Sequence, residues 1–397
     1  MKTVLLISRC PPYPTYLGDR LIFRHMTREL SRRGYTIDLL ALSNHGDDAG
    51  QRAQYERFFR HIELIPEPRR TGSAYLRRLF FPATRFAAAE AASFCPALWR
   101  KIDEYLNRHD YDLVHCFGAV SVYEFHPLFA HLPNVITPYE SYALYLQSAA
   151  RLGKLGAGLR LPIVRRFERF MFTPYDRTVV ISDVDRAMLL GLQPRLNIDV
   201  IPIGIEVERF EPLRRRRDPA TLLFVGNYDY APNEDAARVL VEQALPQLRD
   251  KAPSVKLQLV GVNPPDWMRA LGNSHIEVTG AVPDVRPYLA RATVFVCPLR
   301  IGAGIKNKVL EALAMGIPVV ATPLSVDGIN VRNGESAIIA PVDRIATETL
   351  RLLRDDARRE FLSRKGRALI EAEYSWERTA DSYERLYDEI CLAKALP

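Results

Sequence analysis

Two lysines and one glutamate near residue 310 have the types and spacing that chemistry would need. They lie in residues 298–322, PLRIGAGIKNKVLEALAMGIPVVAT, where a glycine-rich loop leads into a short predicted helix. The functional candidates of this segment are Gly302, Gly304, Lys306, Lys308 and Glu311. Glycines let backbone N–H groups approach an anion closely, and a helix N-terminus adds partial positive charge. With two lysine charges and an acid that can accept two hydroxyl hydrogens, the segment predicts a pocket for a nucleotide diphosphate sugar.

Two other interpretations of this segment involve no sugar nucleotide. Lys308 and Glu311 stand three residues apart and could form an ordinary ion pair on a buried helix. A dinucleotide fingerprint, G-x-G-x-x-G, would require glycine where Asn307 stands, and it belongs in the first βα turn of its domain. The dinucleotide interpretation is therefore disfavoured, whereas the ion pair stays open as an alternative.

Length and charge limit the class of protein. The 397 residues are enough for two domains with full cores. The net charge of +7 belongs entirely to the first 200 residues, which hold 27 Lys and Arg against 20 Asp and Glu. This asymmetry suits a first half that faces an anionic surface or acceptor, although solvated arginine faces are the plainer explanation. Nucleic acid is not an expected partner, because no recognition-helix or zinc-finger pattern accompanies the charge.

The cysteines and the hydrophobic runs predict a cytoplasmic protein. The five cysteines are scattered and form no C-x-x-C motif, which favours reduced thiols. The first residues, MKTVLLISRCPPYP, read as a buried strand followed by a turn rather than as a secretion signal. No run approaches the roughly 18 to 20 apolar residues that span a bilayer.

Apolar runs alternate with helical patterns along the chain, which predicts parallel sheets with crossover helices. A first domain over residues 1–203 and a second over 204–375 are expected, with a helix at about 376–397 packing back on the first. The strands expected for these domains lie near residues 2–8, 35–43, 111–119, 134–141, 177–183 and 198–206, then 222–226, 255–261, 276–282, 293–299 and 318–322. Ligands of such folds sit beyond the carboxyl ends of the strands, so we expect the site in a cleft between the two domains.

Several segments together resemble the retaining glycosyltransferases of family 4 (glycosyltransferase group 1). They include VIPIGIEVERFEP, LLFVGNYDYAPNEDA, HIEVTGAVPDVRPYLARATVFVCPL, GAGIKNKVLEALAMGIPVVAT and EYSWERTADSYERLYDEI, in the family's order along nearly the whole chain. The resemblance implies an α/β protein of the GT-B fold, with two Rossmann-like doubly wound domains facing each other across a cleft. It also implies a hexosyltransferase that needs no metal ion and no other cofactor beside its nucleotide diphosphate sugar.

The resemblance assigns further residues to the donor, and two departures qualify it. It places the donor near Gly226, Asn227, Val282, Asp284, Ile305 and Leu310, with the nucleobase at Val282 to Asp284. The family's donor motif usually begins with a glutamate where Ala303 stands here. Its usual arginine and lysine on the diphosphate are replaced by Asn227 and by the pair Pro232 and Asn233. We therefore expect Lys306 and Lys308 to meet the phosphate charge.

Five residues of the first domain are candidates for the acceptor side of the cleft. They are Gly18, Asp19, His115, Glu140 and Ser182. His115 and Glu140 follow predicted strands, and Glu140 could orient or deprotonate an acceptor hydroxyl. A structural histidine, a hydrogen bond within a loop, and a helix cap by Asp19 are the competing interpretations.

The stretch RRTGSAYLRRLFFPATRF, residues 69–86, interleaves five arginines with aromatic residues and contains no acid. This composition suits peripheral contact with the inner face of an anionic membrane, and an excursion whose aromatics pack inward is the alternative. A second stretch, RLPIVRRFERFMF (residues 160–172), has an apolar stripe at helical spacing, for which core packing is the preferred explanation.

The sequence thus predicts transfer of a sugar from a nucleotide diphosphate sugar to an acceptor hydroxyl with retention. The acceptor is expected to be a growing polysaccharide or a glycolipid. A nucleotide-sugar epimerase or hydrolase on the same fold is one alternative, and a non-catalytic nucleotide-sugar binding protein is another. The sugar, the nucleobase and the linkage leave no readable trace in the sequence.

Overall fold

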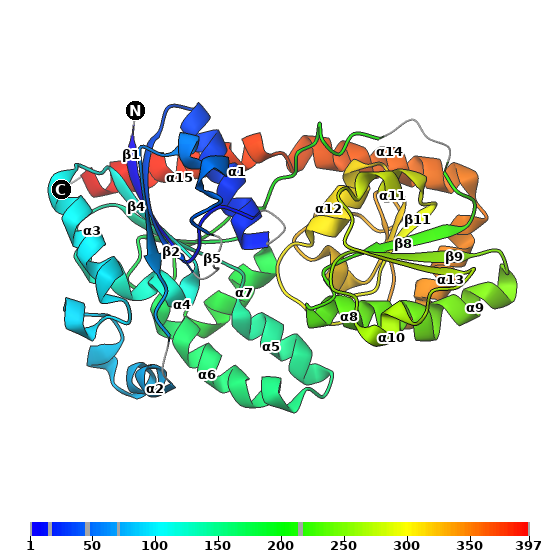
Figure 1. Ribbon diagram of the computed structural model, residues 1–397, viewed down its shortest axis with the longest axis horizontal. Coiled ribbons are helices and arrows are strands. Elements are labelled where there is room, and N and C mark those ends of the chain that lie inside the picture. Colours follow the sequence, from blue (N-terminus) through cyan, green and yellow to red (C-terminus); the bar gives the residue numbers. More distant parts are fainter. Residues whose placement is uncertain (1, 15–17, 44–47, 70–71, 213–216, 396–397) are drawn as a thin grey trace. The chain divides into compact units, whose positions relative to one another are not determined.

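The computed structural model describes residues 2–14, 18–43, 48–69, 72–212 and 217–395. The chain divides into two compact units. Unit 1 comprises Met1–Gln147, Leu155–Gly204 and Trp376–Pro397, and unit 2 comprises Ser148–Lys154 and Ile205–Ser375. Each unit is built around a parallel sheet with helices on both faces (Figure 1). The predicted doubly wound α/β architecture is confirmed.

Unit 1 contains a seven-stranded sheet in the order β3-β2-β1-β4-β5-β6-β7. Its strands are β1 (Thr3–Ser8), β2 (Thr36–Ser43), β3 (His61–Pro66), β4 (Leu113–Phe117), β5 (Asn134–Tyr139), β6 (Arg177–Val180) and β7 (Ile198–Val200). Strands β1 and β4 are almost completely buried because helices cover both of their faces. Strand β3 was not predicted from the sequence; it lies at the sheet edge, where only part of it is buried.

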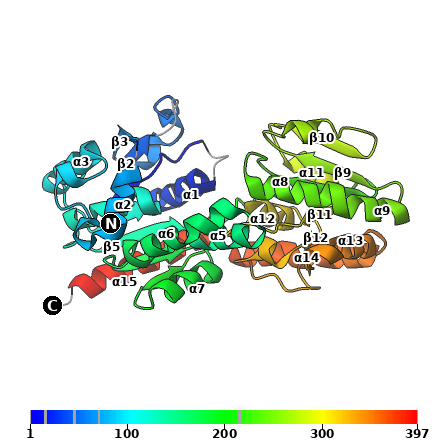
Figure 2. The same cartoon turned by 90° about the horizontal axis from the view of Figure 1, so that it is seen from below.

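The helices of unit 1 form two layers. They are α1 (Gly18–Arg32), α2 (Gly72–Phe80), α3 (Pro96–Arg108), α4 (Ala119–Val122), α5 (Tyr142–Arg151), α6 (Leu155–Met171), α7 (Asp183–Leu192) and α15 (Trp376–Ala395). Helix α5 continues into the short part of unit 2 that begins at Ser148. Helices α1 and α15 lie together on one face of the sheet, and α3, α4, α6 and α7 lie on the other (Figures 1 and 2).

Unit 2 contains a six-stranded sheet in the order β10-β9-β8-β11-β12-β13. Its strands are β8 (Thr221–Val225), β9 (Lys256–Val260), β10 (Ile276–Gly280), β11 (Val294–Cys297), β12 (Val319–Ala321) and β13 (Ile338–Ile339). Five of these strands agree with the predicted ones. The sixth, β13, has only two residues, too short for a hydrophobic pattern to reveal it.

The helices of unit 2 are α8 (Ala231–Arg238), α9 (Leu245–Lys251), α10 (Asp266–Arg269), α11 (Arg286–Arg291), α12 (Asn307–Ala314), α13 (Ile345–Leu353) and α14 (Asp356–Glu373). Helices α8 and α9 cover one face of the sheet, and α11 and α12 cover the other (Figure 1). The short helix predicted before Gly316 is α12, and Gly316 stands just past its end with a φ of +63°. The loop before α12 is therefore joined directly to a helix that packs on the sheet.

Candidate active site

The turn after β8 is held against the turn after β9 by two glycines. Gly261 has a φ of +143°, and a Cβ atom there would stand 1.8 Å from the carbonyl oxygen of Gly226. Only glycine fits this position, because any side chain would collide with backbone that cannot move aside. The N–H of Gly226 donates to the carbonyl of Val260 at 3.0 Å. The backbone of Gly226 and Asn227 is therefore fixed at the carboxyl edge of the sheet, where ligands bind in such folds.

Asn233 in helix α8 connects this turn to α12. Its amide donates to the carbonyl oxygen of Asn227 at 2.7 Å, and its side chain packs so closely on Gly226 that a Cβ there would be 2.9 Å away. The Nζ atom of Lys308 in turn donates to Asn233 Oδ1. From the sequence, Asn233 stands only where the family's usual lysine is missing. In the structure it positions the lysine that α12 supplies instead.

Burial alters the charges of Lys308 and Glu311. The Nζ atom of Lys308 lies 4.4 Å from the centroid of the Phe224 ring, and burial lowers its pKa to about 8. Burial also raises the pKa of Glu311 to about 7, an effect that the charge of Lys308 partly offsets. Within the described part of the chain, no ion pair joins Lys308 directly to Glu311. Both groups can therefore gain from a ligand that brings an anion to the lysine and hydroxyl donors to the glutamate.

The loop before α12 depends on its glycines and on Lys306. Gly302 and Gly304 have φ values of +144° and +65°, a region that favours glycine. The Nζ atom of Lys306 donates to the carbonyl of Ala303 at 2.8 Å and also to the carbonyl of Gly304. In this state Lys306 shapes the loop, and it would reach a phosphate only by exchanging those bonds.

Ile305 and Leu310 are buried, at 8% and 1% exposure. Buried apolar side chains offer a nucleotide only their backbone groups. The two residues therefore fit the expected donor pocket as supports of the loop and of α12.

The expected nucleobase region follows β10. The Nε–H of Arg286 is shared between the two carboxylate oxygens of Asp284, at 3.0 Å from each, and the backbone N–H of Arg286 donates to Asp284 Oδ1 at 2.9 Å. Hydrogen bonds from Arg286 lower the pKa of Asp284. Because the carboxylate is occupied by Arg286, recognition in this region would fall to the backbone and to the half-exposed side chain of Val282.

In unit 1, Gly18 and Asp19 form the first turn of α1. Asp19 accepts a hydrogen bond from the N–H of Arg20 at 2.9 Å and another from Arg9 Nε at 3.0 Å. Burial opposes ionisation of Asp19, but the charge and hydrogen bonds of Arg9 outweigh it and lower the pKa. Asp19 is thus an ionised group that holds Arg9 beside the end of β1.

His115 is completely buried at the centre of the sheet. Its Nδ1 atom lies 2.6 Å from Tyr387 Oη, and its Nε2 atom lies 2.7 Å from Thr137 Oγ1. Burial lowers its pKa far below the ordinary value, so the ring stays neutral. The contact of Nδ1 attaches α15 to the sheet, and the contact of Nε2 joins β4 to β5, so both ring nitrogens are engaged within unit 1. This placement favours the structural interpretation of His115 over the catalytic one.

Glu140 lies on the rim of a cavity in unit 1, and buried carboxylates hold the loop that carries it. The preceding Tyr139 has a φ of +70°, which turns the chain sharply at the end of β5. The N–H of Ser141 donates to Asp185 Oδ1 at 2.8 Å, and the N–H of Tyr142 donates to Glu168 Oε1 at 2.7 Å. The cavity has a volume of about 580 Å³, and both Arg9 and Arg160 line it together with Glu140.

Ser182 is the N-cap of α7 and accepts a hydrogen bond from the N–H of Asp185 at 3.2 Å. The serine is only 1% exposed, which suits a capping role. Asp185 and Glu168 were not expected from the sequence. The only signal for Glu168 was a single acid among the arginines of its helix, and Asp185 was not distinguished from Asp183 in the same helix turn.

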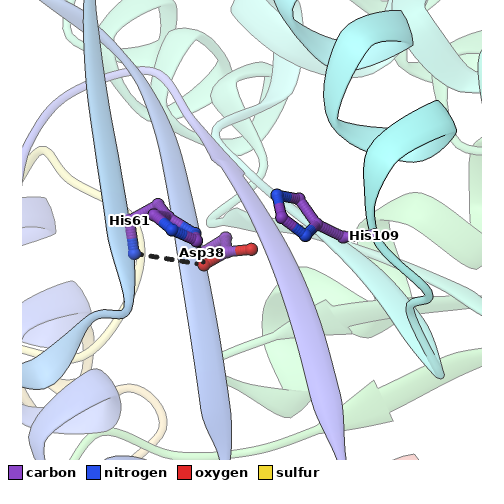
Figure 3. Close-up of side chains that lie close together, drawn as sticks. All are labelled: Asp38, His61 and His109. Atoms are coloured by element: carbon purple, nitrogen blue, oxygen red, sulfur yellow. Dashed lines mark hydrogen bonds and ion pairs between the residues drawn. The ribbon is translucent and has the colours of Figure 1, made fainter.

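Possible metal ligands occur in unit 1. Asp38, His61 and His109 bring potential ligand atoms within 4.8 Å of one another (Figure 3). However, Asp38 already accepts two bonds from Arg60 and one from Tyr111, and the guanidinium charge would repel a cation. Two Asp-x-Asp spacings also occur, at residues 110–112 and 183–185. Of their acids, Asp185 is committed to the loop after β5 and Asp112 to the N–H of Thr3. These arrangements support structural roles.

Comparisons with known proteins agree with the geometry. Residues 22–209 match the model of the family described as "Glycosyltransferase Family 4", and residues 219–355 match "Glycosyl transferases group 1". The two ranges together cover well over half of the chain. The chain is 27% identical over 313 residues to the phosphatidyl-myo-inositol mannosyltransferase of Mycobacterium tuberculosis. The aligned region spans 75% of this chain and 79% of that protein. It is 31% identical over 169 residues to the putative colanic acid biosynthesis glycosyltransferase WcaL of Escherichia coli, over 38% of this chain and 40% of that one.

Solved structures share the complete fold. Sucrose-phosphate synthase from Thermosynechococcus elongatus superposes with a TM-score of 0.73 at 18% identity, over 99% of this chain and 100% of that one. HepE from Anabaena, solved in complex with UDP, gives a TM-score of 0.68 at 12% identity, over 98% and 100%. The chain has the GT-B fold and belongs to the family 4 glycosyltransferases of group 1.

Proposed function

We propose that this glycosyltransferase uses a nucleotide diphosphate sugar and transfers the sugar, with retention, to a hydroxyl group of a lipid-linked or polysaccharide acceptor. The observation that carries the proposal is the arrangement in unit 2. Lys308 is held by Asn233 beside the Gly226 turn, and Glu311 lies one turn further along α12. The structure of HepE with UDP and the names of the mannosyltransferase relatives support the classes of donor and acceptor.

Stabilisation of the leaving group would supply most of the rate. As the bond between the sugar and the diphosphate breaks, negative charge grows on the diphosphate. The ammonium group of Lys308 and the N–H groups at the start of α12 would bind this charge without reorganising. Glu311 would fix the nucleotide by accepting hydrogen bonds from the ribose hydroxyls. In this proposal the protein itself neutralises the diphosphate, and we expect activity to be unchanged by a metal chelator such as EDTA.

On the acceptor side, we assign Glu140 to the attacking hydroxyl. It lies on the rim of the cavity in unit 1, on a loop whose backbone is fixed by Asp185 and Glu168. A carboxylate there can orient the hydroxyl and accept its proton. The position of Asp19 beside Arg9 supports a lesser role for Gly18 and Asp19 at the same acceptor.

Residues 69–86 support peripheral membrane contact at the cytoplasmic side. Residues 70 and 71 and the side chains of residues 72–75 lie outside the described part. Of the remaining side chains, Leu76, Phe80 and Phe81 are 54%, 61% and 62% exposed, whereas Leu79 is buried. Among the residues that the structure describes, none of the helices combines the length and the apolar character needed to cross a bilayer. Arg77 is exposed beside these aromatics and suits an anionic membrane surface, whereas Arg78 pairs with the buried Glu124 and Arg85 stacks on Phe170.

The first experiment is thermal unfolding with a panel of nucleotide diphosphates and their sugars. A ligand that binds only the folded protein stabilises it by about 2.7 kcal/mol at 100 times its Kd. One nucleotide family should raise the Tm of the wild type, and Glu311→Ala and Lys308→Ala should abolish the rise. Glu360→Ala and Lys365→Ala, exposed on α14, are the matched controls. No shift of the wild type with any nucleotide would contradict the donor site.

Membrane contact is tested by cosedimentation with vesicles of phosphatidylglycerol and phosphatidylcholine. We expect binding that grows with the anionic fraction and weakens in salt. The double variant Phe80→Ser/Phe81→Ser should bind several times more weakly, while Leu392→Ser, exposed on α15, should not differ from the wild type. Equal binding by both variants would refute this part of the proposal.

A further inference from the structure

Helix α6 carries a row of apolar side chains that passes from solvent into the interior of unit 1. Leu155 and Leu159 are 85% and 77% exposed, and Ile163 is 43% exposed. Phe167 and Met171 continue the row at 6% and 4% exposure. Residues four positions apart form a continuous ridge on a helix surface. The ridge therefore offers an apolar path from the surface to the inner end of α6.

The stripe predicted in residues 160–172 is thus only partly a core feature. Phe167, Phe170 and Met171 pack in the hydrophobic core, as expected, but Ile163 does not. Exposed leucine and isoleucine side chains on a charged helix cost free energy unless something covers them. The exposed half of the ridge is therefore the part to which an apolar ligand would bind.

The ridge leads to the cavity on whose rim Glu140 lies. Ile163, Val164, Phe167 and Met171 line the cavity from α6, and its volume of about 580 Å³ is within the ordinary range for small-ligand sites. Residues that follow β4 and β5, among them Val120, also line the cavity. Part of the cavity lining is thus apolar, and the partly exposed Ile163 belongs both to this lining and to the ridge.

Two arginines, Arg9 and Arg160, and two glutamates, Glu140 and Glu168, line the cavity. Helix α6 carries four arginines and one glutamate. The glutamate, Glu168, is buried and accepts bonds from Ser141 and from the N–H of Tyr142, so its carboxylate points into the protein. Arg160 lines the cavity and its guanidinium lies 5.8 Å from the centroid of the Tyr142 ring. A ligand with an apolar chain and an anionic end would match both parts.

We propose that this cavity binds a single acyl or isoprenyl chain of a phosphate-bearing lipid acceptor, and that the α6 ridge guides the chain into it. The proposal rests on the function proposed above, because it names the chemical class of the acceptor that Glu140 would serve. The chain occupies the apolar part of the lining between α6 and the residues after β4, and Arg160 faces the phosphate. The acceptor hydroxyl is then held near Glu140 by the lipid part of the molecule.

Binding of alkyl phosphates to the full chain tests the proposal. Hexyl, octyl, decyl and dodecyl phosphate are titrated by calorimetry below their critical micelle concentrations, with inorganic phosphate as the chain-free reference. Burial of one methylene contributes about 0.8 kcal/mol, so affinity should rise about fourfold per carbon until the cavity is full. Dodecyltrimethylammonium, with the opposite charge, should bind at least tenfold more weakly than dodecyl phosphate. An affinity that is independent of chain length would overturn the proposal.

Two variants separate the cavity from the surface. Val164→Trp fills the cavity and should weaken dodecyl phosphate binding at least tenfold, while Val184→Trp on α7 is the matched control. If Val164→Trp fails to fold, Ile163→Glu places a charge on the lining at an already exposed position, and Leu392→Glu controls for it. Full dodecyl phosphate binding by the folded cavity variant would overturn the proposal. So would a loss of binding caused equally by Phe80→Ser/Phe81→Ser, which would mean that lipid binds only at the surface.

The nucleotide panel is measured on the same variants, so that the two proposals can fail separately. Val164→Trp should keep the full nucleotide-dependent rise in Tm. If nucleotides stabilise the protein but alkyl phosphates do not bind, the cavity proposal fails and the donor site stands. If alkyl phosphates bind with the expected chain dependence but no nucleotide does, the lipid site stands and the proposed transferase donor fails.

Discussion

The two candidate sites of this protein are built in different ways. The donor site in unit 2 consists of turns and one helix start, where Gly226, Gly261 and the loop before α12 place backbone groups. The acceptor cavity in unit 1 consists of side chains from the ends of two strands and from α6. A diphosphate is the same in every sugar nucleotide and can be bound by backbone amides, whereas an acceptor requires a shaped wall. We therefore expect unit 2 to be sensitive to changes in the backbone and unit 1 to changes in side-chain volume.

The close contact between Gly261 and Gly226 makes the backbone of unit 2 the part most sensitive to substitution. Gly261→Ala puts a Cβ atom 1.8 Å from the carbonyl oxygen of Gly226 at a φ of +143°. We expect a loss of about 3 to 5 kcal/mol in the free energy of unfolding, measured by urea denaturation. Gly18→Ala in unit 1, where nothing lies within 4 Å of the new Cβ, should change it by less than about 0.5 kcal/mol. Equal losses of stability from the two substitutions would show that the backbone of unit 2 is no more sensitive than that of unit 1.

The next effect concerns the charge that the donor turns hold. Lys308→Met should lower kcat/KM for the donor by about 100-fold to 1,000-fold, the usual cost of removing one group that stabilises developing charge. Lys306→Met should cost less, about tenfold, because Lys306 is engaged with the carbonyls of its own loop. Steady-state kinetics on both variants give the ratio. A larger loss from Lys306→Met would reverse the assignment of the two lysines.

The assignment of His115 to the framework of unit 1 predicts an effect on stability alone. Tyr387→Phe removes the partner of His115 Nδ1 and should destabilise the protein by about 1 to 3 kcal/mol. The kcat of the folded enzyme should stay within a factor of two, and Tyr288→Phe in unit 2 serves as the control for stability. A fall in kcat with unchanged stability would return His115 to the list of functional residues.

The smallest effect is the pH dependence of the donor site without its ligand. Glu311 has a pKa of about 7 when folded, above its ordinary value of 4.5, because burial opposes its ionisation. The unfolded chain releases this proton at lower pH, so the contribution of Glu311 is favourable below about pH 4.5 and is lost as pH rises through 7. Since the side chain is only half-buried, we expect the loss to be about 1 to 2 kcal/mol between pH 5 and pH 8.

Glu311→Gln should remove this part of the pH dependence, measured as Tm between pH 5 and pH 8. Glu360→Gln, on the exposed side of α14, should retain it. Lys308 contributes with the opposite sign, since its pKa is lowered to about 8, and its contribution is present in both variants. A pH profile of Glu311→Gln identical to that of the wild type would show that Glu311 is not the group involved.

The difference between the two sites also explains what could be predicted from the sequence. The donor loop is continuous, so its glycines, lysines and Glu311 could be recognised together. Parallel sheets with crossover helices followed from alternating strands and helices, and the doubly wound GT-B fold was implied by the family resemblance. The hydrogen-bond partner of Lys308 could not be predicted, because Asn233 lies 75 positions away along the chain. Glu168 and Asp185 meet the loop after β5 only once the strands have been ordered. His115 was ambiguous for the same reason, since Tyr387 lies at the far end of the chain.

The last helix gives the protein an unusual order of completion during synthesis. Helix α15 belongs to unit 1, where Trp376 stacks on His25 with ring centroids 4.6 Å apart and Arg33 pairs with Glu384 at 2.8 Å. A ribosome adds about 5 to 20 residues per second and releases the N-terminus first. All of unit 2 is therefore translated before the first unit receives its final helix. Until then the apolar side of α1 is uncovered, so nascent chains that stall before Trp376 should be the ones that engage chaperones.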